Sequence, residues 1–378
     1  MEKRISVFAF FSGIGILDFA FERNGFDIVF VNEYDAEFMQ AYKNVRQRMH
    51  MAAPLYGCHN DSAERYAKHR GKKKIVSLVD QERKKGNLVG FIGGPPCPDF
   101  SLAGKNAGAK GKNGKLTKTY FDIICRCKPD FFLFENVKGL VKTEKHRHFY
   151  DEMKKKALAN DYIVDDTIAN ALEYGVPQFR ERIFMIGIHK SLFSRQTNKL
   201  SFNWKRYALF DIGNILSMNW PTTDPFVVDG VLPFPSQKLP QTLTVEYWFE
   251  KNDVLHHING NDIFRVKAGR EKISSISEGD TRGKSFKRLH RWRYSPTAAY
   301  GHNEVHLHPY KERRISVAEA MAIQSLPKDF VVLQTLPLSQ KFKMIGNGVP
   351  YLMAAAIAKA LKETLHEIQE ENNAENSD

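Results

Sequence analysis

The sequence predicts an α/β protein with a Rossmann-like sheet and a smaller second domain. Through the first 190 residues, short apolar stretches alternate with amphipathic ones, which is typical of parallel strands connected by helices. A turn containing two glycines follows the first apolar stretch, as in doubly wound folds. Between residues 191 and 312 the alternation gives way to short strands, prolines and basic clusters, which indicates a separate module.

Each expected element has its own signal in the sequence. The first strand, 5–10, is apolar and ends at the glycine turn, and an amphipathic stretch then leads to the second strand, 27–31. Helical spacing of apolar residues returns after residue 313. The further strands are expected at 88–92, 131–134 and 182–188, and the further helices at 119–127, 148–159, 316–324 and 351–368.

These elements divide the chain into four segments. Residues 1–190 form the first domain and residues 191–312 the smaller one. Residues 313–369 form a C-terminal segment whose helix returns to the first domain. The last residues, 370–378, are polar and acidic, and we expect them to be a disordered tail.

Composition limits the class of protein. The chain has 378 residues, of which 42% are hydrophobic, so it can bury a large core, and this excludes a fibrous or mostly disordered protein. No apolar run reaches the roughly 18 residues that span a bilayer, and no signal peptide is apparent. The four cysteines lack the spacing of a disulfide framework, so we expect a cytoplasmic protein. The formal net charge of +13 favours a polyanionic partner.

The glycine turn is a candidate cofactor site. Gly13 and Gly15 allow the backbone to turn sharply after the first strand and to present N–H groups to a ligand. Glu33 follows the second strand, where a carboxylate can bind ribose hydroxyls. An ordinary tight turn and a dinucleotide-dependent oxidoreductase are the alternatives at this point.

A cysteine in a rigid turn is a candidate nucleophile. Cys97 lies in Gly93-Gly94-Pro95-Pro96-Cys97, after an apolar strand, and Glu135 ends the next expected strand. Methylation of cytosine at C5 requires a thiolate to add at C6, which creates an enamine that attacks an activated methyl group. A carboxyl group with a raised pKa eases this addition by protonating ring N3. Cys97 and Glu135 suit these two roles, although each is also compatible with a purely structural position.

Six short motifs occur along the chain in one order. They are Phe11-Ser12-Gly13-Ile14-Gly15, Pro95-Pro96-Cys97, Glu135-Asn136-Val137, Gln178-Phe179-Arg180-Glu181-Arg182, Arg313-Arg314-Ile315-Ser316-Val317-Ala318-Glu319-Ala320 and Gly346-Asn347-Gly348-Val349-Pro350. In this order they resemble the DNA (cytosine-5)-methyltransferase family, of the bacterial restriction-modification type, over nearly the whole chain. Two departures stand out, Ile16 where many members have glycine and Ser316 where threonine is common, and we expect neither to affect the chemistry.

The resemblance implies a Rossmann-like S-adenosylmethionine-dependent methyltransferase domain followed by a target recognition domain. It implies that Cys97 is the nucleophile, that Glu135 is the acid and that Arg182 binds the cytosine O2, with Arg180 in the same catalytic group. The implied residues of the S-adenosyl-L-methionine site are Phe11, Gly13, Gly15, Glu33, Tyr34, Asp61, Pro95, Asn347 and Gly348. The implied DNA-binding residues are Ser101, Lys105, Lys110, Lys112, Gln178, Thr242 and Arg291.

The family resemblance also implies the partners. The substrate is duplex DNA with the target cytosine flipped out of the stack, and a cognate restriction endonuclease is the expected functional partner. We expect a monomer associated with the nucleoid in the cytoplasm, with no membrane contact. No metal site is expected, because the pairs His256-His257 and His306/His308 lack a companion cysteine or acid at ligand spacing, and these histidines should lie on the surface or contact phosphates.

Three other functions remain as alternatives. A tRNA cytosine-5 methyltransferase of the same family shares the cofactor and nucleophile motifs, but its Cys-Phe-Thr element is absent here. A catalytically silent DNA-binding regulator is disfavoured because Cys97, Glu135 and Arg182 are all present. An oxidoreductase leaves the Pro-Pro-Cys turn and the C-terminal motif unexplained.

Overall fold

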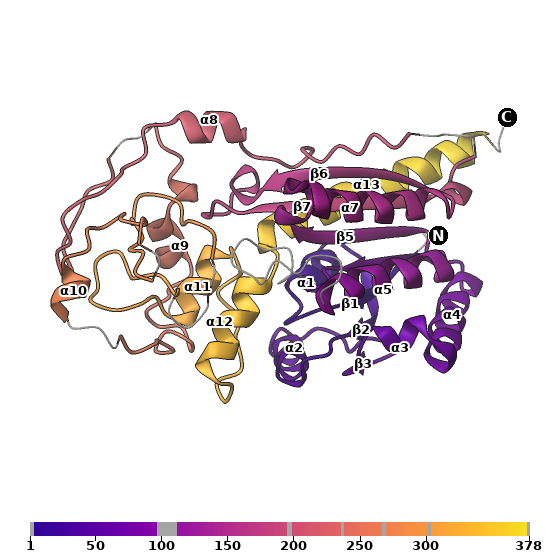
Figure 1. The fold of residues 1–378 in the computed structure, drawn as a ribbon, viewed down its shortest axis with the longest axis horizontal. Coiled ribbons are helices and arrows are strands. Elements are labelled where there is room, and N and C mark those ends of the chain that lie inside the picture. The colour runs from indigo at the N-terminus through magenta and orange to yellow at the C-terminus, as the bar shows by residue number, and fades with distance from the viewer. Residues whose placement is uncertain are drawn as a thin grey trace.

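The first half of the chain and its last helix build a sheet covered by helices, beside a second lobe rich in loops (Figure 1). The computed structural model describes residues 4–96, 112–194, 199–235, 238–266, 270–283, 285–298, 300 and 304–375. The strands are β1 (Ile5–Phe10), β2 (Asp27–Asn32), β3 (Cys58–His59), β4 (Leu88–Gly93), β5 (Phe131–Val137), β6 (Tyr162–Asn170) and β7 (Glu181–His189). The α-helices are α1 (Ile16–Arg23), α2 (Ala36–Arg48), α3 (Glu64–Ala67), α4 (His69–Lys84), α5 (Lys112–Cys127), α6 (Gly139–Lys142), α7 (Glu144–Leu158), α8 (Ile212–Ser217), α9 (Val245–Lys251), α10 (Arg270–Ser274), α11 (Val317–Ile323), α12 (Leu338–Asn347) and α13 (Tyr351–Glu375).

The strands of the described residues form one mixed sheet in the order β3-β2-β1-β4-β5-β7-β6. From β3 to β5 all neighbours are parallel, so the carboxyl ends of β1, β2, β4 and β5 meet at one edge. All six residues of β1 and of β4 are buried, which explains why both read as continuous apolar runs. Sites in such sheets lie at the carboxyl edge of the strands.

Two strands depart from the expected pattern. The strand β7 is antiparallel to both of its neighbours, and β6, which the sequence analysis missed, forms the sheet edge. The middle of β6 is only half-buried and contains Asp165 and Asp166, so it lacks an apolar run. An exposed edge strand of this kind gives a weak sequence signal.

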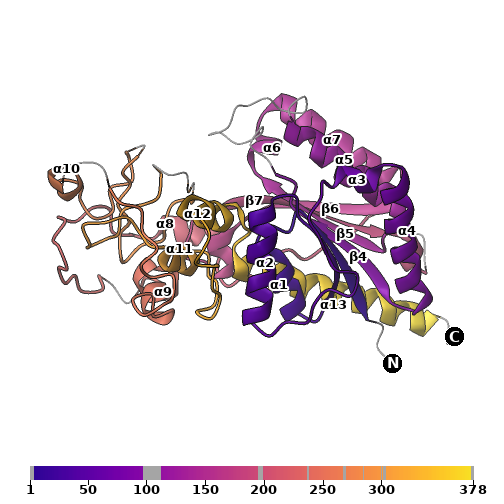
Figure 2. The ribbon, with the colours of Figure 1, turned by 90° about the horizontal axis from the view of Figure 1, so that it is seen from below.

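Helices cover both faces of the sheet (Figure 2). On one face, apolar residues of α1, α2 and α13 pack against the strands, and on the other face those of α4, α5 and α7 do so. Gly90 of β4 and Gly187 of β7 make this packing possible, because a Cβ at either position would lie 1.9 Å and 2.1 Å from the rings of Phe131 and Phe132. The core therefore lies on both sides of one central sheet.

The second lobe begins later than the sequence suggested. Leu200 and Phe202 are buried against the core of the first domain, and Arg206 forms ion pairs with Glu363 and Glu367 of α13 at 2.8 Å and 2.7 Å. The change to the loop-rich lobe therefore comes near residue 210 rather than 191. A separate apolar core joins α9, α11 and α12 of this region to α1 and α2.

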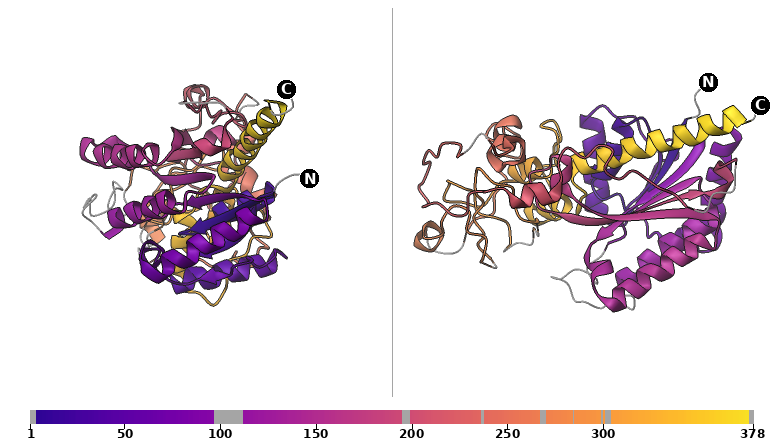
Figure 3. Two further views of the ribbon diagram at one scale, coloured as in Figure 1. Left: turned by 90° about the vertical axis from the view of Figure 1, so that its right-hand side faces the viewer. Right: turned by 90° about the horizontal axis from the view of Figure 1, so that it is seen from above.

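The last helix is longer than expected. It continues to Glu375, so the expected disordered tail is wrong for residues 370–375. The run 338–374 has the length and composition of a membrane span, but 56% of its most apolar window is buried within the fold. Figure 3 shows α13 lying along the sheet, where it packs on α1, and this burial accounts for its hydropathy.

Candidate active site

The glycine turn lies at the carboxyl end of β1 and is held in an uncommon backbone conformation. Phe11, Gly13 and Gly15 all have positive φ, at 56°, 59° and 86°. The Ser12 N–H donates to the Asn32 carbonyl at 3.2 Å, which ties the turn to the end of β2. A Cβ on Gly13 would meet no atom within 4 Å, so the turn borders open space. The turn therefore has room beside it for a ligand.

Glu33 joins the glycine turn to the end of β2. Its carboxylate accepts hydrogen bonds from the N–H groups of Gly13 at 2.9 Å and Asp35 at 2.8 Å. Burial raises the pKa of Glu33, and these two N–H groups oppose that rise. The neighbouring Tyr34 side chain is 69% exposed, so its ring face is free to stack on a planar group.

Asp61 lies on the next segment and is fixed by three partners. Its carboxylate accepts from Asn32 Nδ2 at 3.2 Å and from the Tyr66 hydroxyl at 2.8 Å, and it pairs with Arg65 Nη1 at 2.6 Å. Asn32 also donates to the Asp61 carbonyl at 2.7 Å. These bonds hold Asp61 at the same sheet edge as Glu33.

The C-terminal motif returns to this edge at the end of α12. Asn347 is exposed, and a Cβ on Gly348 would lie 2.5 Å from Ile16 Cδ1. Gly348 leaves room for the Ile16 side chain because it has no side chain of its own. Ile16, where many members of the family have glycine, therefore packs on the C-terminal motif.

Glu135 and Arg182 form an ion pair at the ends of β5 and β7. The register places Glu135 opposite Phe184 and Arg182 opposite Val137, so the two side chains are diagonal neighbours on one face. Arg182 Nε lies 3.1 Å from Glu135 Oε1, and both side chains are about nine-tenths buried. Burial raises the pKa of Glu135, while the charges of Arg182 and Arg180 lower it.

The segment leading to Cys97 is packed against Glu135. A Cβ on Gly94 would lie 2.6 Å from Glu135 Oε2, so only glycine leaves this carboxylate in place. Asn136 Nδ2 donates to the Pro95 carbonyl at 3.3 Å and ties the segment to β5. Four predicted residues beyond this point, Cys97, Ser101, Lys105 and Lys110, lie outside the described residues, as does the side chain of Lys112 at the start of α5.

Arg180 and Gln178, predicted to be a catalytic and a DNA-binding residue, lie inside the protein and bond to neighbouring segments. Arg180 is fully buried, and its guanidinium donates to the carbonyls of Gly346 at 2.7 Å and Gly348 at 3.0 Å. Gln178 is also fully buried and bonds to Gln324 and to the amide of Ala298. Neither side chain reaches solvent in this structure. Arg180 holds the C-terminal motif, and Gln178 bonds to Arg180 and to the end of α11.

Two residues of the second lobe were predicted to bind DNA, and only one is accessible. Thr242 is exposed, and its carbonyl accepts from Trp248 Nε1 at 2.9 Å. Arg291 is 7% exposed and makes two bonds to the buried Glu278 carboxylate, at 2.9 Å and 2.8 Å. The charge of Arg291 is therefore paired within the lobe.

Two of the histidines expected on the surface of the second lobe, His306 and His308, are buried, whereas His256 is exposed. His306 and His308 are each 1% exposed, which corrects the expectation that they contact solvent or phosphate. His308 Nε2 lies 3.4 Å from the buried Glu319, which also forms a pair with Arg313 at 2.7 Å. Among the described residues, no group of three or more histidine, cysteine or acidic side chains is arranged to hold a metal ion.

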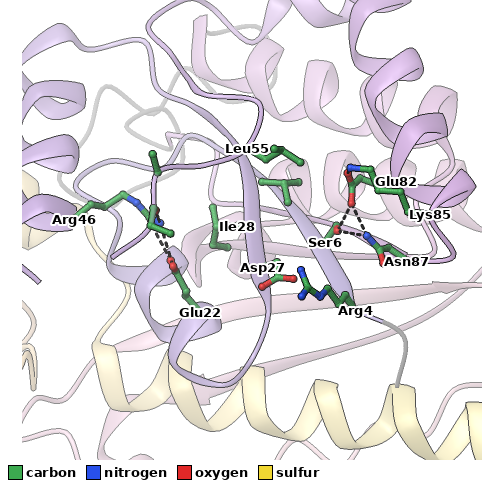
Figure 4. A pocket seen from close by; sticks show the side chains of 13 residues that line it. Arg4, Ser6, Glu22, Asp27, Ile28, Arg46, Leu55, Glu82, Lys85 and Asn87 are labelled. Atoms are coloured by element: carbon green, nitrogen blue, oxygen red, sulfur yellow. Dashed lines mark hydrogen bonds and ion pairs between the residues drawn. The ribbon is translucent and has the colours of Figure 1, made fainter. Parts of the chain in front are cut away.

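A polar hollow of about 290 Å³ lies at the opposite edge of the sheet, where β1, β2 and β4 begin (Figure 4). Its lining includes Arg4, Glu22, Asp27 and Glu82. Glu82 is 1% exposed and accepts from Ser6, as Figure 4 shows. The hollow is therefore separate from the residues gathered at the carboxyl edge.

Two residues beneath the glycine turn were missed by the sequence analysis. Asp18, on α1, is 1% exposed, and Tyr42, on α2, is also 1% exposed and lies directly under Gly15. The signal for Asp18 is an acidic residue inside the apolar run Ile16-Leu17-Asp18-Phe19-Ala20-Phe21. Gly94 was part of a recognised motif, but its contact with Glu135 was not predictable.

Comparison with known proteins gives consistent matches over nearly the whole chain. Residues 5–363 match the family described as C-5 cytosine-specific DNA methylase. The Type II methyltransferase M.NmeDI of Neisseria meningitidis serogroup C is 50% identical over 96% of this chain and 85% of its own length. The Type II methyltransferase M.FnuDI of Fusobacterium nucleatum is 29% identical over 96% of this chain and 95% of its own length.

Solved structures match the fold. A putative DNA modification methyltransferase encoded within an E. coli prophage aligns with a TM-score of 0.64 at 22% identity, covering 96% of this chain and 99% of that one. The Dnmt2 methyltransferase of S. pombe aligns with a TM-score of 0.58 at 12% identity, covering 97% and 99% of the two chains. At these identities the likeness concerns the fold alone.

Proposed function

This chain belongs to the C-5 cytosine-specific DNA methylase family and is a DNA cytosine-5 methyltransferase of the restriction-modification type, and on that premise we propose that it acts by covalent catalysis through Cys97. The observation that supports this most is the buried Glu135–Arg182 pair, against which the backbone of Gly94 is packed. The chain runs from Gly94 through two prolines to Cys97. The thiol therefore follows a short, stiff segment anchored on the acid.

The cofactor site proposed for S-adenosyl-L-methionine is the carboxyl edge of β1 and β2. The open space beside Gly13 and the exposed ring of Tyr34 fit a nucleoside, and Glu33 fits its ribose hydroxyls. Asp61, Asn347 and the main chain of Phe11, Gly15, Pro95 and Gly348 complete the proposed site. When bound, the cofactor supplies the methyl group.

The protein's own groups carry the remaining steps. The Cys97 thiolate adds to C6 of the flipped cytosine, and the electron pair of the C5–C6 double bond becomes available at C5. Glu135, whose pKa burial raises, holds a proton at ring N3 and so stabilises this adduct. Arg182 donates to the cytosine O2. After methylation, loss of the C5 proton to a base and expulsion of the thiolate restore the ring.

The DNA is proposed to bind through the second lobe and the lysine-rich stretch after Cys97. Thr242 is the exposed candidate in the lobe, and Ser101, Lys105, Lys110 and Lys112 are the candidates in the stretch. The lobe, from near residue 210 to 312, serves as the target recognition domain. The enzyme is proposed to act as a monomer on the nucleoid, where it protects host DNA from a cognate restriction endonuclease.

The test is transfer of labelled methyl from S-adenosylmethionine to duplex DNA and to tRNA in parallel. Bisulfite sequencing of the DNA product should show methylated cytosines in one recurring short sequence. Cys97→Ala should abolish transfer, whereas Cys58→Ser, which alters a half-buried thiol on β3, should retain it. Substantial methylation by Cys97→Ala would refute the covalent mechanism, and label only in tRNA would assign the protein to a tRNA substrate.

A further inference from the structure

A buried carboxyl group lies directly beneath the proposed cofactor turn. Asp18 occupies the first turn of α1, on its inner side, and is 1% exposed. The hydroxyls of Ser12, within the turn, and of Tyr42, on α2, face this carboxyl group and stabilise its charged form. Asp18 Oδ2 and Ser12 Oγ are nevertheless each buried without a well-formed hydrogen bond among the described residues. Asp18 Oδ2 and Ser12 Oγ can therefore bond to each other after a small adjustment of the turn.

Tyr42 supports the same turn from below. A Cβ on Gly15 would lie 2.6 Å from Tyr42 Cε2, so the backbone of the turn rests on the tyrosine ring. The Tyr42 hydroxyl accepts from Arg46 Nη1 at 3.4 Å. Arg46 in turn makes two bonds to Glu22 of α1, at 2.7 Å and 3.1 Å, which Figure 4 shows at the wall of the polar hollow.

These contacts form a continuous column of polar side chains between α1 and α2. The Asp18 column, as we name it, consists of Glu22, Arg46, Tyr42, Asp18 and Ser12. It runs from the hollow at one edge of the sheet to the turn at the other. None of its members is among the residues proposed to touch the cofactor or the DNA.

The column places an acid inside an otherwise apolar stretch of α1. Burial, with a smaller effect of the Glu22 charge, raises the pKa of Asp18 to about 7. The Ser12 and Tyr42 hydroxyls and the charge of Arg46 lower it, but by less. Keeping such a group is costly, and perturbed acids beside a binding turn are candidates for a functional role. Its neighbours, the Phe19, Ala20 and Phe21 side chains, are apolar as expected of a core helix.

We propose that Asp18 is a positioning residue for the cofactor, holding the Ser12–Gly15 turn in its binding conformation through Ser12 and through Tyr42. The inference rests on the proposed function, in which this turn holds S-adenosylmethionine. Asp18 acts on the turn and not on the reacting atoms. Its loss is therefore expected to weaken cofactor binding and to leave the methyl-transfer step itself unchanged.

The test measures binding of S-adenosylhomocysteine by calorimetry, together with steady-state kinetics on duplex DNA. Asp18→Ala should weaken binding about tenfold, the effect of one lost buried polar anchor. KM for S-adenosylmethionine should rise by a similar factor, with kcat changed less than twofold. Asp18→Asn, which keeps the shape and a donor for Ser12, should bind within about threefold of the parent protein.

A matched control separates this effect from general destabilisation. Glu82→Gln alters another buried acid of the same domain, at the opposite edge of the sheet, and should leave binding of S-adenosylhomocysteine unchanged. Folded Asp18→Ala with parental affinity would overturn the inference, as would an equal loss in Glu82→Gln. If Asp18→Ala does not fold, a tenfold loss in Asp18→Asn would also overturn it. A parent protein that binds no S-adenosylhomocysteine would instead refute the proposed cofactor site.

Discussion

Replacing Asp18 by asparagine should change how the stability of the protein depends on pH. The pKa of Asp18 is about 7 in the folded protein and near its ordinary value of 3.8 when unfolded. Between these values the folded protein keeps the proton that the unfolded chain has lost, so folding becomes less favourable as pH rises. At 1.36 kcal/mol per unit, this amounts to about 4 kcal/mol between pH 4 and pH 7, and the loss is complete above pH 7.

Asp18→Asn removes that dependence. Its amide carries no charge at any of these pH values, so its stability relative to the parent protein should increase by up to about 4 kcal/mol from pH 4 to pH 8. A constant offset of about 1–2 kcal/mol from an imperfectly bonded amide does not alter this slope. The measurement is urea unfolding of both proteins at pH 5, 6, 7 and 8, followed by tryptophan fluorescence.

The exposed Asp80 provides the control for the asparagine substitution. Asp80→Asn, on the outer side of α4, should shift stability by less than about 0.5 kcal/mol at every pH. If the difference between Asp18→Asn and the parent protein is the same at pH 5 and pH 8, Asp18 is ionised across this range in the folded state. Burial would then not raise the pKa of Asp18 as inferred.

Three further substitutions test the packing around the site. Arg180→Met should destabilise the protein by about 3–5 kcal/mol in urea unfolding, because the buried Gly346 and Gly348 carbonyls lose their charged donor. A variant as stable as the parent protein would show that these hydrogen bonds do not hold the C-terminal motif. Gly15→Ala should lower the melting temperature far more than Gly13→Ala, since both have positive φ but only Gly15 lacks space, and calorimetric melting compares them directly. Gly348→Ala should lower the free energy of unfolding by about 1–2 kcal/mol, because the new Cβ meets Ile16. In a double-mutant cycle, Ile16→Val should restore part of this loss, and strict additivity would show that the two residues do not interact.

Much of the sheet was predictable because its inner strands are buried on both faces. β1 and β4 are entirely buried, and a strand of that kind reads as an unbroken apolar run. β6 was missed because two acids in its middle interrupt the apolar pattern. Partners from other elements satisfy these acids, since Asp165 accepts from the amide of Phe202 and Asp166 from the Tyr150 hydroxyl. No local pattern reports those partners.

The candidate site was predictable only where one motif carries the whole signal. Glu135 and Arg182 were identified from their motifs, but their contact depends on the antiparallel register of β5 and β7, which the sequence did not indicate. The burial of Arg291 was not predictable, because it lies in a basic cluster and its partner Glu278 is 13 positions away in a loop. The contacts of Arg180 were not predictable, because its acceptors, the Gly346 and Gly348 carbonyls, lie 166 and 168 positions later.

The packing of α13 also sets an order for events during synthesis. Its apolar side covers strands and a helix that leave the ribosome first, yet about 160 residues separate the end of β7 from the start of α13. At translation rates of about 5–20 residues per second, this face of the sheet waits on the order of ten to thirty seconds for its cover. A nascent chain therefore exposes an apolar surface to which chaperones can bind. Arg180 can bond to the Gly346 and Gly348 carbonyls only after that last motif has been synthesised, so an interrupted chain has no assembled site.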